Sequence, residues 1–528
     1  MNIRGKEIMK KAYSGIMLMI QLISVLTLAF GVQQAKSEPS TIVVPDDYAT
    51  IQKAVDAANL GDTIYVRAGI YRENVVASKT VSLVGENRAT TIIDGLGSGT
   101  VVYVTANNVN ISGFTIRNSG VQTVWPPDSG IILWYSDRST ITNCNITSNG
   151  GYGFLCVTSR YYTISNSVVS HNNYIGIAIG DTGSSNGVIR NNTVCSNRGS
   201  GGIEAYWGSD YTIVENNTVY NNAWIGIAIG WSQYCVIRNN ILCNTVASSV
   251  VLDTASYCSV ANNEISNSTH GGVTLLGLGN YFNSILNNTV YSSGTGIDLG
   301  ANARYTEISG NIMSMNEYGL RISNAPGYEN FGNKIFHNDF INNKQQAVDN
   351  AINIPVPNVW DDGYPSGGNY WSDYSGKDEN GDGIGDVPYR IGGTARSRDC
   401  YPLMNPQVAV VRAKIDVKPD TLNLRSKGNW VTVYIELPAC YKVADIDVSS
   451  IMLNGTVHAE SRPASIGDYD NDGVPDLMVK FDRAKVIRFI SSSIGKLGKN
   501  MTVTLTITGE LHKRATFRGS DEIRIRSK

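Results

Sequence analysis

The sequence predicts an all-β protein that consists of a parallel β-helix followed by a small C-terminal β-sandwich. Short apolar strands with a G-[IV]-x-[LI] core, some with one variant residue, begin at Gly130, Gly153, Gly176, Gly202, Gly226, Ser249, Gly272, Gly296 and Gly319. Successive starts are 23 to 26 residues apart. A period this steady over nine units indicates a solenoid, in which each repeat forms one coil.

A second series with the same period supports the solenoid. Its members precede an apolar pair or alternation and are Cys144, Ser167, Asn192, Asn217, Asn240, Asn263, Asn288, Asn311 and Asn338. Asparagine tolerates left-handed backbone at turns, and stacked amides bond one another along a fibre or coil axis. We therefore expect these asparagines to be structural, although several also form N-x-[ST] sequons, the acceptor sites of a glycoprotein.

The cysteines are not arranged as a disulfide scaffold or as a C-x-x-C metal site. Cys235 and Cys258 are 23 residues apart and share a register in adjacent coils. Strands about 4.8 Å apart permit a disulfide there, but two thiols that fill equivalent core positions are the favoured interpretation.

Residues 1–37 are predicted to be a signal peptide. Basic residues precede an apolar run over residues 16–32, and small residues near 35–37 suit cleavage. An uncleaved membrane anchor is the alternative, because the run is long. Removal of the segment would leave a net charge of about −6. A secreted or cell-surface protein is expected, and nothing in the sequence suggests nucleic-acid binding.

One short amphipathic helix is expected at the start of the ordered chain. Ile51, Ala54, Val55 and Ala58 have helical spacing, and Thr50 is a candidate N-cap. Strand-like runs follow at residues 62–66, 80–84 and 101–105. The first coil of a solenoid exposes an unpaired edge and an open core, so a helix here is expected to cap it.

The string VPDDYATIQKAVDAANLGDTIYVRAGIYRENV, with the later I-x-x-N-x-[IV] coils, resembles right-handed parallel β-helix proteins of the NosD-like or carbohydrate-binding and sugar-hydrolysis group. The resemblance covers about residues 41–404. The segment GGNYWSDYSGKDENGDGIGDVPYRIGG is similar to the end of many archaeal surface proteins of that group. The resemblance implies the right-handed fold and export. It leaves function open, because the group includes polysaccharide enzymes, surface proteins and accessory proteins of copper maturation.

The acidic string within that segment predicts a structural calcium site. Carboxylate, amide and carbonyl oxygens at this spacing suit Ca²⁺, and Gly383 permits the sharp turn. A full EF-hand loop would carry Glu at the position of Tyr389, so a shorter loop is expected. The predicted ligands are Asp378, Asn380, Asp382, Ile384 and Asp386. The solenoid is expected to span residues 41–405, with this loop capping its C-terminal end.

The pattern changes after residue 406, and a β-sandwich is expected over residues 411–528. Runs at residues 430–435, 477–481 and 501–507 alternate with period two. A loop of this region repeats the acidic spacing and predicts a second calcium site. Its predicted ligands are Asp468, Asp470, Asp472, Val474 and Asp476.

Outward positions of the solenoid contain candidate glycan-binding residues. In G-[IV]-x-[LI] the residue x is expected to point outward, which gives the stripe Ile132, Leu155, Ala178, Glu204, Ala228, Val251, Thr274, Asp298 and Arg321. Nearby aromatics suit the apolar faces of sugar rings, and they are Trp134, Tyr206, Trp207 and Trp231. The alternative is that these aromatics coat the sheet or are covered by longer turns.

The candidate catalytic carboxylates are Glu204, Asp253, Asp298 and Asp181, which are expected on roughly one face. A glycosidase needs two carboxylates about 5 to 10 Å apart, and a lyase needs a base with a neutralising cation. The sequence shows no clustered set of this kind. The five histidines do not share a register, as a copper site would require.

The sequence therefore predicts an exported, calcium-containing surface protein that binds a glycan or cell-envelope polysaccharide without catalysis. Contact with a membrane is expected only through an uncleaved N-terminal anchor. The alternatives are a polysaccharide lyase, glycoside hydrolase or epimerase that acts on the same face, and a NosD-like accessory protein in copper maturation.

Overall fold

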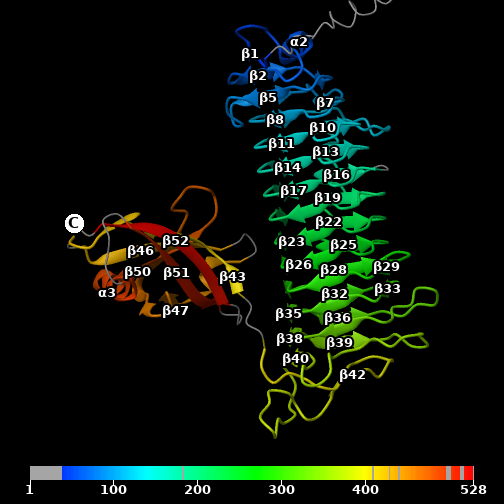
Figure 1. Cartoon of the computed structure of the whole chain (residues 1–528), viewed down its shortest axis with the longest axis vertical. Coiled ribbons are helices and arrows are strands. Elements are labelled where there is room, and N and C mark those ends of the chain that lie inside the picture. The colour runs from blue at the N-terminus through cyan, green and yellow to red at the C-terminus, as the bar shows by residue number, and fades with distance from the viewer. Residues whose placement is uncertain are drawn as a thin grey trace, which may run out of the picture.

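A computed structural model describes residues 38–180, 183–406, 410–426, 428–437, 441–494, 501–511 and 516–526. The predicted signal peptide and Asp181 lie outside these residues. The described part of the chain forms a long β-solenoid, with a smaller β-module over residues 410–526 beside it (Figure 1). Within the described part, no helix is long and apolar enough to cross a membrane.

Sheet A is the first of three parallel sheets that form the solenoid. Its thirteen strands are β1 (Thr41–Val44), β2 (Thr63–Val66), β5 (Ser82–Gly85), β8 (Asn110–Ser112), β11 (Thr140–Thr142), β14 (Thr163–Ser165), β17 (Val188–Arg190), β20 (Ile213–Glu215), β23 (Val236–Arg238), β26 (Ser259–Ala261), β30 (Ser284–Leu286), β34 (Glu307–Ser309) and β37 (Lys334–Phe336).

Sheet B follows sheet A within each coil. Its strands are β3 (Gly69–Arg72), β6 (Thr91–Asp94), β9 (Thr115–Arg117), β12 (Asn145–Thr147), β15 (Val168–Ser170), β18 (Thr193–Cys195), β21 (Thr218–Tyr220), β24 (Ile241–Cys243), β27 (Glu264–Ser266), β31 (Thr289–Tyr291), β35 (Ile312–Ser314), β38 (Asp339–Ile341) and β40 (Tyr370–Trp371).

Sheet C carries the longest strands and completes each coil. Its strands are β4 (Val75–Ala77), β7 (Val102–Val104), β10 (Ser129–Trp134), β13 (Tyr152–Val157), β16 (Ile177–Gly180), β19 (Gly201–Tyr206), β22 (Ile225–Gly230), β25 (Val250–Asp253), β28 (Gly271–Leu276), β32 (Thr295–Leu299), β36 (Tyr318–Ile322) and β39 (Gln345–Asp349). The nine predicted strand starts fall in or directly before β10 to β36, which confirms the period.

The core lies inside the coils, and the short strands explain its composition. In a three-residue strand only the middle side chain points inward, so one β-branched residue per strand is sufficient. Ile146, Val169 and Val194 pair in register in successive strands of sheet B and are fully buried. Burial of each such side chain stabilises the fold by about 1.5 to 3 kcal/mol.

The predicted asparagine series forms a hydrogen-bonded ladder inside the solenoid. From Asn192 to Asn338, each Nδ2 donates to the Oδ1 of the next member at 2.9 to 3.1 Å. The ladder continues through Asn369 and ends on Asp399, whose Oδ2 accepts from the Asn369 backbone N–H at 2.7 Å. Burial raises the pKa of Asp399 to about 6, although these N–H bonds oppose the shift.

The expected N-terminal helix is present as α2 (Ile51–Ala57). Thr50 Oγ1 accepts from the Lys53 backbone N–H at 3.2 Å, which confirms the N-cap. Ile51, Ala54 and Val55 are buried in the solenoid core. The helix lies at the N-terminal end of the coils (Figure 1).

Two short strand pairs complete the solenoid region: β29 (Asn280–Tyr281) pairs in parallel with β33 (Ala303–Arg304), and β41 (Tyr389–Arg390) pairs antiparallel with β42 (Arg398–Asp399). Cys235 and Cys258 are buried free thiols, as the favoured interpretation of their shared register predicts. Cys243 is disulfide-bonded.

The C-terminal module contains two sheets that share one hydrophobic core. One sheet contains β43 (Val410–Arg412), β45 (Thr421–Asn423), β47 (Ile446–Leu453), β48 (Val457–His458), β51 (Met501–Leu511) and β52 (Thr516–Arg526), and the other contains β44 (Lys414–Lys418), β46 (Trp430–Glu436), β49 (Glu460–Gly467) and β50 (Asp476–Asp482). Helix α3 (Arg483–Ile494) and the 3₁₀ helix η1 (Val443–Asp445) were not expected from the sequence.

The predicted outward stripe on sheet C is mostly buried. Ile132, Leu155 and Ala178 point away from the main core but pack in a separate apolar cluster on the outer face. Tyr103, Trp134 and other aromatic rings partly cover this cluster. Residues on one face of a parallel sheet lie only about 4.8 Å apart between strands, so they also cover one another.

Candidate functional site

A cleft of about 700 Å³ lies on the outer face of sheet C. Its lining is apolar and aromatic, with one carboxylate among the described residues. The lining residues are Trp125, Tyr152, Leu155, Ile175, Ala178, Ile179, Gly180, Glu204, Tyr206 and Trp207. We call this the sheet C cleft.

The cleft exists because one strand of sheet C lacks bulky outward side chains. We call each strand of this sheet, stacked on the strand of the previous coil, a rung. Ala178 of β16 pairs with Leu155 on one side and with Glu204 on the other. Two residues further along β16, Gly180 pairs with Val157. A Cβ built on Gly180 would meet no atom within 4 Å, so the space above this glycine is open.

Aromatic side chains form the walls of the cleft. Trp125 comes from the long connection between β9 and β10 and is half exposed. Tyr152 packs edge-on against Tyr174, with ring centroids 4.7 Å apart. Trp207 stacks on Trp231 with centroids 5.4 Å apart and planes 14° apart. Two of the predicted aromatic residues therefore form a pair at one edge of the cleft.

Tyr206 lies over a glycine in the next rung. A Cβ built on Gly230 would lie 2.1 Å from the Tyr206 ring, so only glycine permits this ring position. Burial raises the pKa of Tyr206, and the nearby carboxylates of Glu204 and Asp253 raise it further. The phenol therefore remains protonated and able to donate a hydrogen bond.

Among the described lining residues, Glu204 provides the only carboxylate. Its Oε1 atom is buried and has no hydrogen-bond partner among the described residues. The carboxylate packs over Gly201, where a Cβ would lie 2.4 Å from Oε1. Burial raises the pKa of Glu204, and a hydrogen bond from Ser200 opposes this shift. A buried acceptor without a partner costs about 1 to 3 kcal/mol, which a ligand hydroxyl could recover.

Trp134, the remaining predicted aromatic, lies outside the lining. Its ring stacks on Tyr103 with centroids 6.4 Å apart and packs on the outer apolar cluster. Trp134 is in the same column as Tyr206 but three rungs away, with β13 and β16 between them. It therefore covers apolar surface beside the cleft.

Among the described residues, the candidate catalytic carboxylates Glu204, Asp253 and Asp298 are not brought together. Asp253 lies two rungs from Glu204, about 10 Å along the axis, and accepts a bond from Thr254 Oγ1 at 3.2 Å. Asp298 forms a bidentate ion pair with Arg321 of the next rung, in which Arg321 Nη2 and Nε donate to the two carboxylate oxygens at 2.6 and 3.1 Å. Burial raises the pKa of Asp253.

A second column of aromatic residues was missed by the sequence reasoning. Its rings lie just before strands of sheet A, stack with centroids 5.1 to 5.4 Å apart and planes 8° to 15° apart, and are 43 to 52% exposed. We call this the aromatic ladder, formed by Tyr211, Tyr234, Tyr257, Phe282 and Tyr305. The signal was an aromatic residue every 23 or 25 positions.

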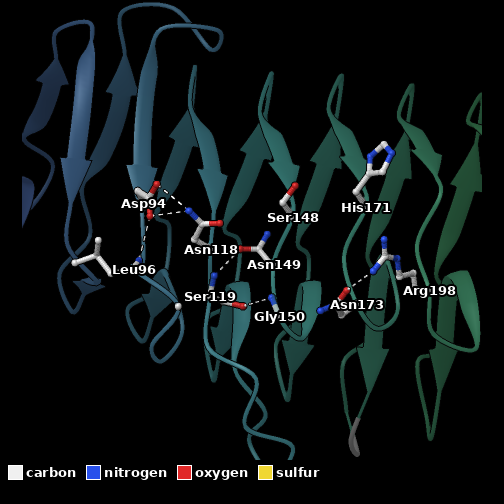
Figure 2. Close-up of a pocket in the computed structure, with 11 residues that line it drawn as sticks. Asp94, Leu96, Asn118, Ser119, Ser148, Asn149, Gly150, His171, Asn173 and Arg198 are labelled. Carbon is white, nitrogen blue, oxygen red and sulfur yellow. Dashed lines mark hydrogen bonds between the residues drawn. The ribbon is translucent and has the colours of Figure 1, made fainter.

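Another cleft, also of about 700 Å³, is polar and lies near the ends of the sheet B strands (Figure 2). His171 and Arg198 line it, and Arg198 donates to Asn173 Oδ1 at 3.5 Å. Burial alone would raise the pKa of Asp94 in this cleft. Hydrogen bonds from Asn118, the Leu96 N–H and Arg117 outweigh burial and leave the pKa below its usual value. The carboxylate of this cleft is therefore already satisfied.

The two predicted calcium loops, residues 378–386 and 468–476, have matching backbone geometry. In both loops, the side chain of the first residue accepts hydrogen bonds from the backbone N–H groups of the fifth and sixth residues. The carboxylate of the fifth residue accepts from the N–H of the seventh, and the carboxylate of the ninth accepts from the N–H of the second. These distances are 2.7 to 3.2 Å in the first loop and 2.9 to 3.1 Å in the second. Oxygen-rich loops of this shape fit Ca²⁺.

The second acidic loop also contacts a lysine. Lys414 Nζ lies 2.9 Å from Asp470 and 3.0 Å from Asp472, and it also pairs with Glu436 at 2.5 Å. Ligand oxygens of Asp468, Asp470 and Asp476 lie within 4.8 Å of one another. Within the described residues, the potential metal-ligand groups of three or more are all carboxylates from this loop and Glu436.

Two family models match the chain. A model described as "Periplasmic copper-binding protein (NosD)" matches residues 202–376, and a model described as "Right handed beta helix region" matches residues 67–219. No match was found among curated proteins.

Solved structures of other β-helix proteins are similar to this chain. The Azotobacter vinelandii mannuronan C-5 epimerase AlgE6 A-module is 18% identical, with a TM-score of 0.51, and the match covers 58% of this chain and 92% of that one. The AlgE4 A-module from the same organism is 20% identical over 60% of this chain and 96% of its own, with a TM-score of 0.48. At this identity, the AlgE6 match shows the shared fold alone.

Proposed function

We propose that this right-handed parallel β-helix protein, whose residues 202–376 match the NosD family, binds a glycan in the sheet C cleft. The observation that supports the proposal is the combination of aromatic walls with one unpartnered carboxylate oxygen. Trp125, Tyr206 and Trp207 offer apolar surface to a sugar ring, and Glu204 Oε1 offers an acceptor to a hydroxyl. The volume of the cleft is within the usual range for small-ligand sites.

Binding without catalysis fits the described carboxylates better than turnover. Hydrolysis at a glycosidic bond needs a second carboxylate about 5 to 10 Å from the first. Glu204 is the only carboxylate in the described lining, Asp253 lies two rungs away, and Asp298 is neutralised by Arg321. A lyase or epimerase would need a cation to neutralise its substrate, and no Lys, Arg or His is among the described lining residues.

Export and structural calcium are further parts of the proposal. The basic and apolar composition of residues 1–37 supports export, and the NosD family description names a periplasmic protein. The matched geometry of the two acidic loops supports calcium. The potential metal-ligand groups in the described residues contain no His or Cys, the residue types that suit copper.

A binding and turnover experiment tests the proposed function. The purified chain is screened against immobilised polysaccharides, and bound glycans are then incubated with it while reducing ends and unsaturated products are measured. Retention of at least one polysaccharide, without product, is expected. Release of product would favour the enzyme alternative.

A matched pair of variants tests whether the glycan binds in the sheet C cleft. Trp207→Ala removes a cleft wall, whereas Tyr211→Ala removes a similarly exposed ring from the end of the aromatic ladder. Retention is expected to fall about tenfold for Trp207→Ala and to be unchanged for Tyr211→Ala. Equal losses, or none for Trp207→Ala, would contradict the proposed site.

A further inference from the structure

The described side chains of the sheet C cleft include a negative charge and no positive charge. The described lining contains one carboxylate, Glu204, and no basic side chain. The remaining hydrogen-bonding side chains are Tyr152 and Tyr206, whose phenols burial keeps protonated by raising their pKa, and Trp125 and Trp207, each with one indole N–H donor. The side chains that the structure describes in the cleft thus offer hydrogen-bond donors and one acidic acceptor, without a positive charge.

From this charge distribution we infer that the cleft selects uncharged glycans and rejects glycans that carry carboxylate or sulfate groups. This inference rests on the proposed glycan-binding function and names its ligand class. A neutral sugar hydroxyl can donate to Glu204 Oε1, which lacks a partner among the described residues. A uronate carboxylate in the same position would meet a like charge in a partly desolvated cleft.

The chemistry of the cleft walls favours the same class of ligand. Neutral hexoses present apolar C–H faces with hydroxyls at their rims, and the cleft presents aromatic rings around an apolar floor at Ala178. Recognition of carboxylates in proteins relies instead on cationic or multiple N–H donors. Cationic side chains of that kind, His171 and Arg198, line the separate polar cleft (Figure 2) and are not among the described lining residues of the sheet C cleft.

Titration of hexasaccharides into the intact chain tests the selectivity. The neutral probes are cello-, laminari- and manno-hexaose, and the anionic probes are hexamers of alginate and polygalacturonate, all at pH 7 with calcium present. At least one neutral probe is expected to bind at least 100-fold more tightly than either anionic probe. An anionic probe that binds as tightly as the best neutral one, and is lost in Gly180→Leu, would overturn the inference.

Glu204→Gln provides the matched control, because it keeps the shape and removes the charge. Neutral binding is expected to fall by no more than about tenfold. The preference for neutral over anionic probes is expected to narrow to less than tenfold, because the repulsion is gone. An unchanged preference in Glu204→Gln would overturn the role given to this carboxylate. If no probe of either class binds the wild-type chain, the proposed function itself fails, which is a different result from loss of selectivity.

Discussion

The sheet C cleft and the aromatic ladder expose similar aromatic surface but differ in what their rungs contain. In the aromatic ladder every rung from Tyr211 to Tyr305 supplies a ring, and each inner ring has both faces covered by its neighbours. In the cleft the outward positions of β16 are only Ala178 and Gly180, so adjacent aromatics border an open space. Exposed rings alone therefore do not open a cleft on this solenoid, whereas a rung without bulky outward side chains does.

Filling the open rung gives the largest expected effect. Gly180→Leu places a side chain in free space, because a Cβ at Gly180 meets nothing within 4 Å and the residue is not among those with positive φ. Glycan affinity is expected to fall at least 100-fold, while the melting temperature changes by less than about 2 °C. Titration calorimetry and thermal unfolding measure the two quantities.

Retained affinity in a folded Gly180→Leu variant would contradict the position of the site. Gly230→Leu is a useful contrast, because a Cβ there would displace the Tyr206 ring. That variant is expected to lose both affinity and stability.

Breaking the aromatic ladder should change stability and leave binding intact. Tyr257 has positive φ and stacks on Tyr234 and Phe282, and asparagine tolerates the same backbone conformation. Tyr257→Asn removes two stacked pairs, each worth about 0.5 to 1.5 kcal/mol. The free energy of unfolding is expected to fall by about 1 to 3 kcal/mol in denaturant titration. Loss of glycan affinity in this variant would mean that the ladder itself binds.

The stability contribution of the sheet C cleft should depend on pH, because the cleft contains the buried carboxyl of Glu204 and the aromatic ladder contains no carboxyl. Burial raises the pKa of this carboxyl, so the folded state keeps its proton at pH values where the unfolded chain, with a pKa of about 4.3, has lost it. The contribution of Glu204 to stability is therefore greatest below the unfolded pKa and is lost as pH rises through the folded pKa. Glu204→Gln is expected to be more stable than wild type by roughly 1 kcal/mol at pH 8 and to lose that advantage near pH 4.

The stability difference between Glu204→Gln and the wild-type protein is measured from their melting temperatures between pH 4 and pH 8. Asp399 also has a raised pKa but is present in both proteins, so it cancels. A constant difference across this range would show that Glu204 does not titrate differently in the folded state.

Removal of calcium gives the smallest expected effect on glycan affinity and should leave both the sheet C cleft and the aromatic ladder unchanged. Loops of this type in extracellular modules bind Ca²⁺ with Kd of about 0.1 to 1 mM, so 2 mM Ca²⁺ stabilises each by about 0.6 to 1.8 kcal/mol. A chelator is expected to lower the melting temperature by a few degrees without changing glycan affinity. Lys414→Ala is expected to increase the calcium response of the second loop, because its ammonium competes for Asp470 and Asp472.

An unchanged melting temperature in chelator would remove the calcium proposal. A fall in glycan affinity would place the metal in the binding site.

The sequence predicted the repeating parts of this fold well, because each coil meets the same physical demand. Inward β-branched residues such as Ile146 and Val169, and the Asn192 to Asn338 ladder, recur because every coil must fill one core and satisfy one turn. Helix α3 was missed, because it belongs to the module without repeats.

The cleft was only partly predictable. Glu204, Tyr206 and Trp207 were identified from their outward register, and all three line it. The open space arises from Ala178 and Gly180, and a small residue gives no positive signal unless neighbouring rungs are compared. Trp125 reaches the cleft from a connection outside the repeat, so its register carried no information.

A crystal structure of the chain soaked with a neutral hexasaccharide tests the central claim most directly. The account predicts a sugar ring above Ala178, between Trp125 and Trp207, with a hydroxyl within hydrogen-bond distance of Glu204 Oε1. Sugar density along the aromatic ladder or in the polar cleft, with the sheet C cleft empty at millimolar ligand, would contradict it.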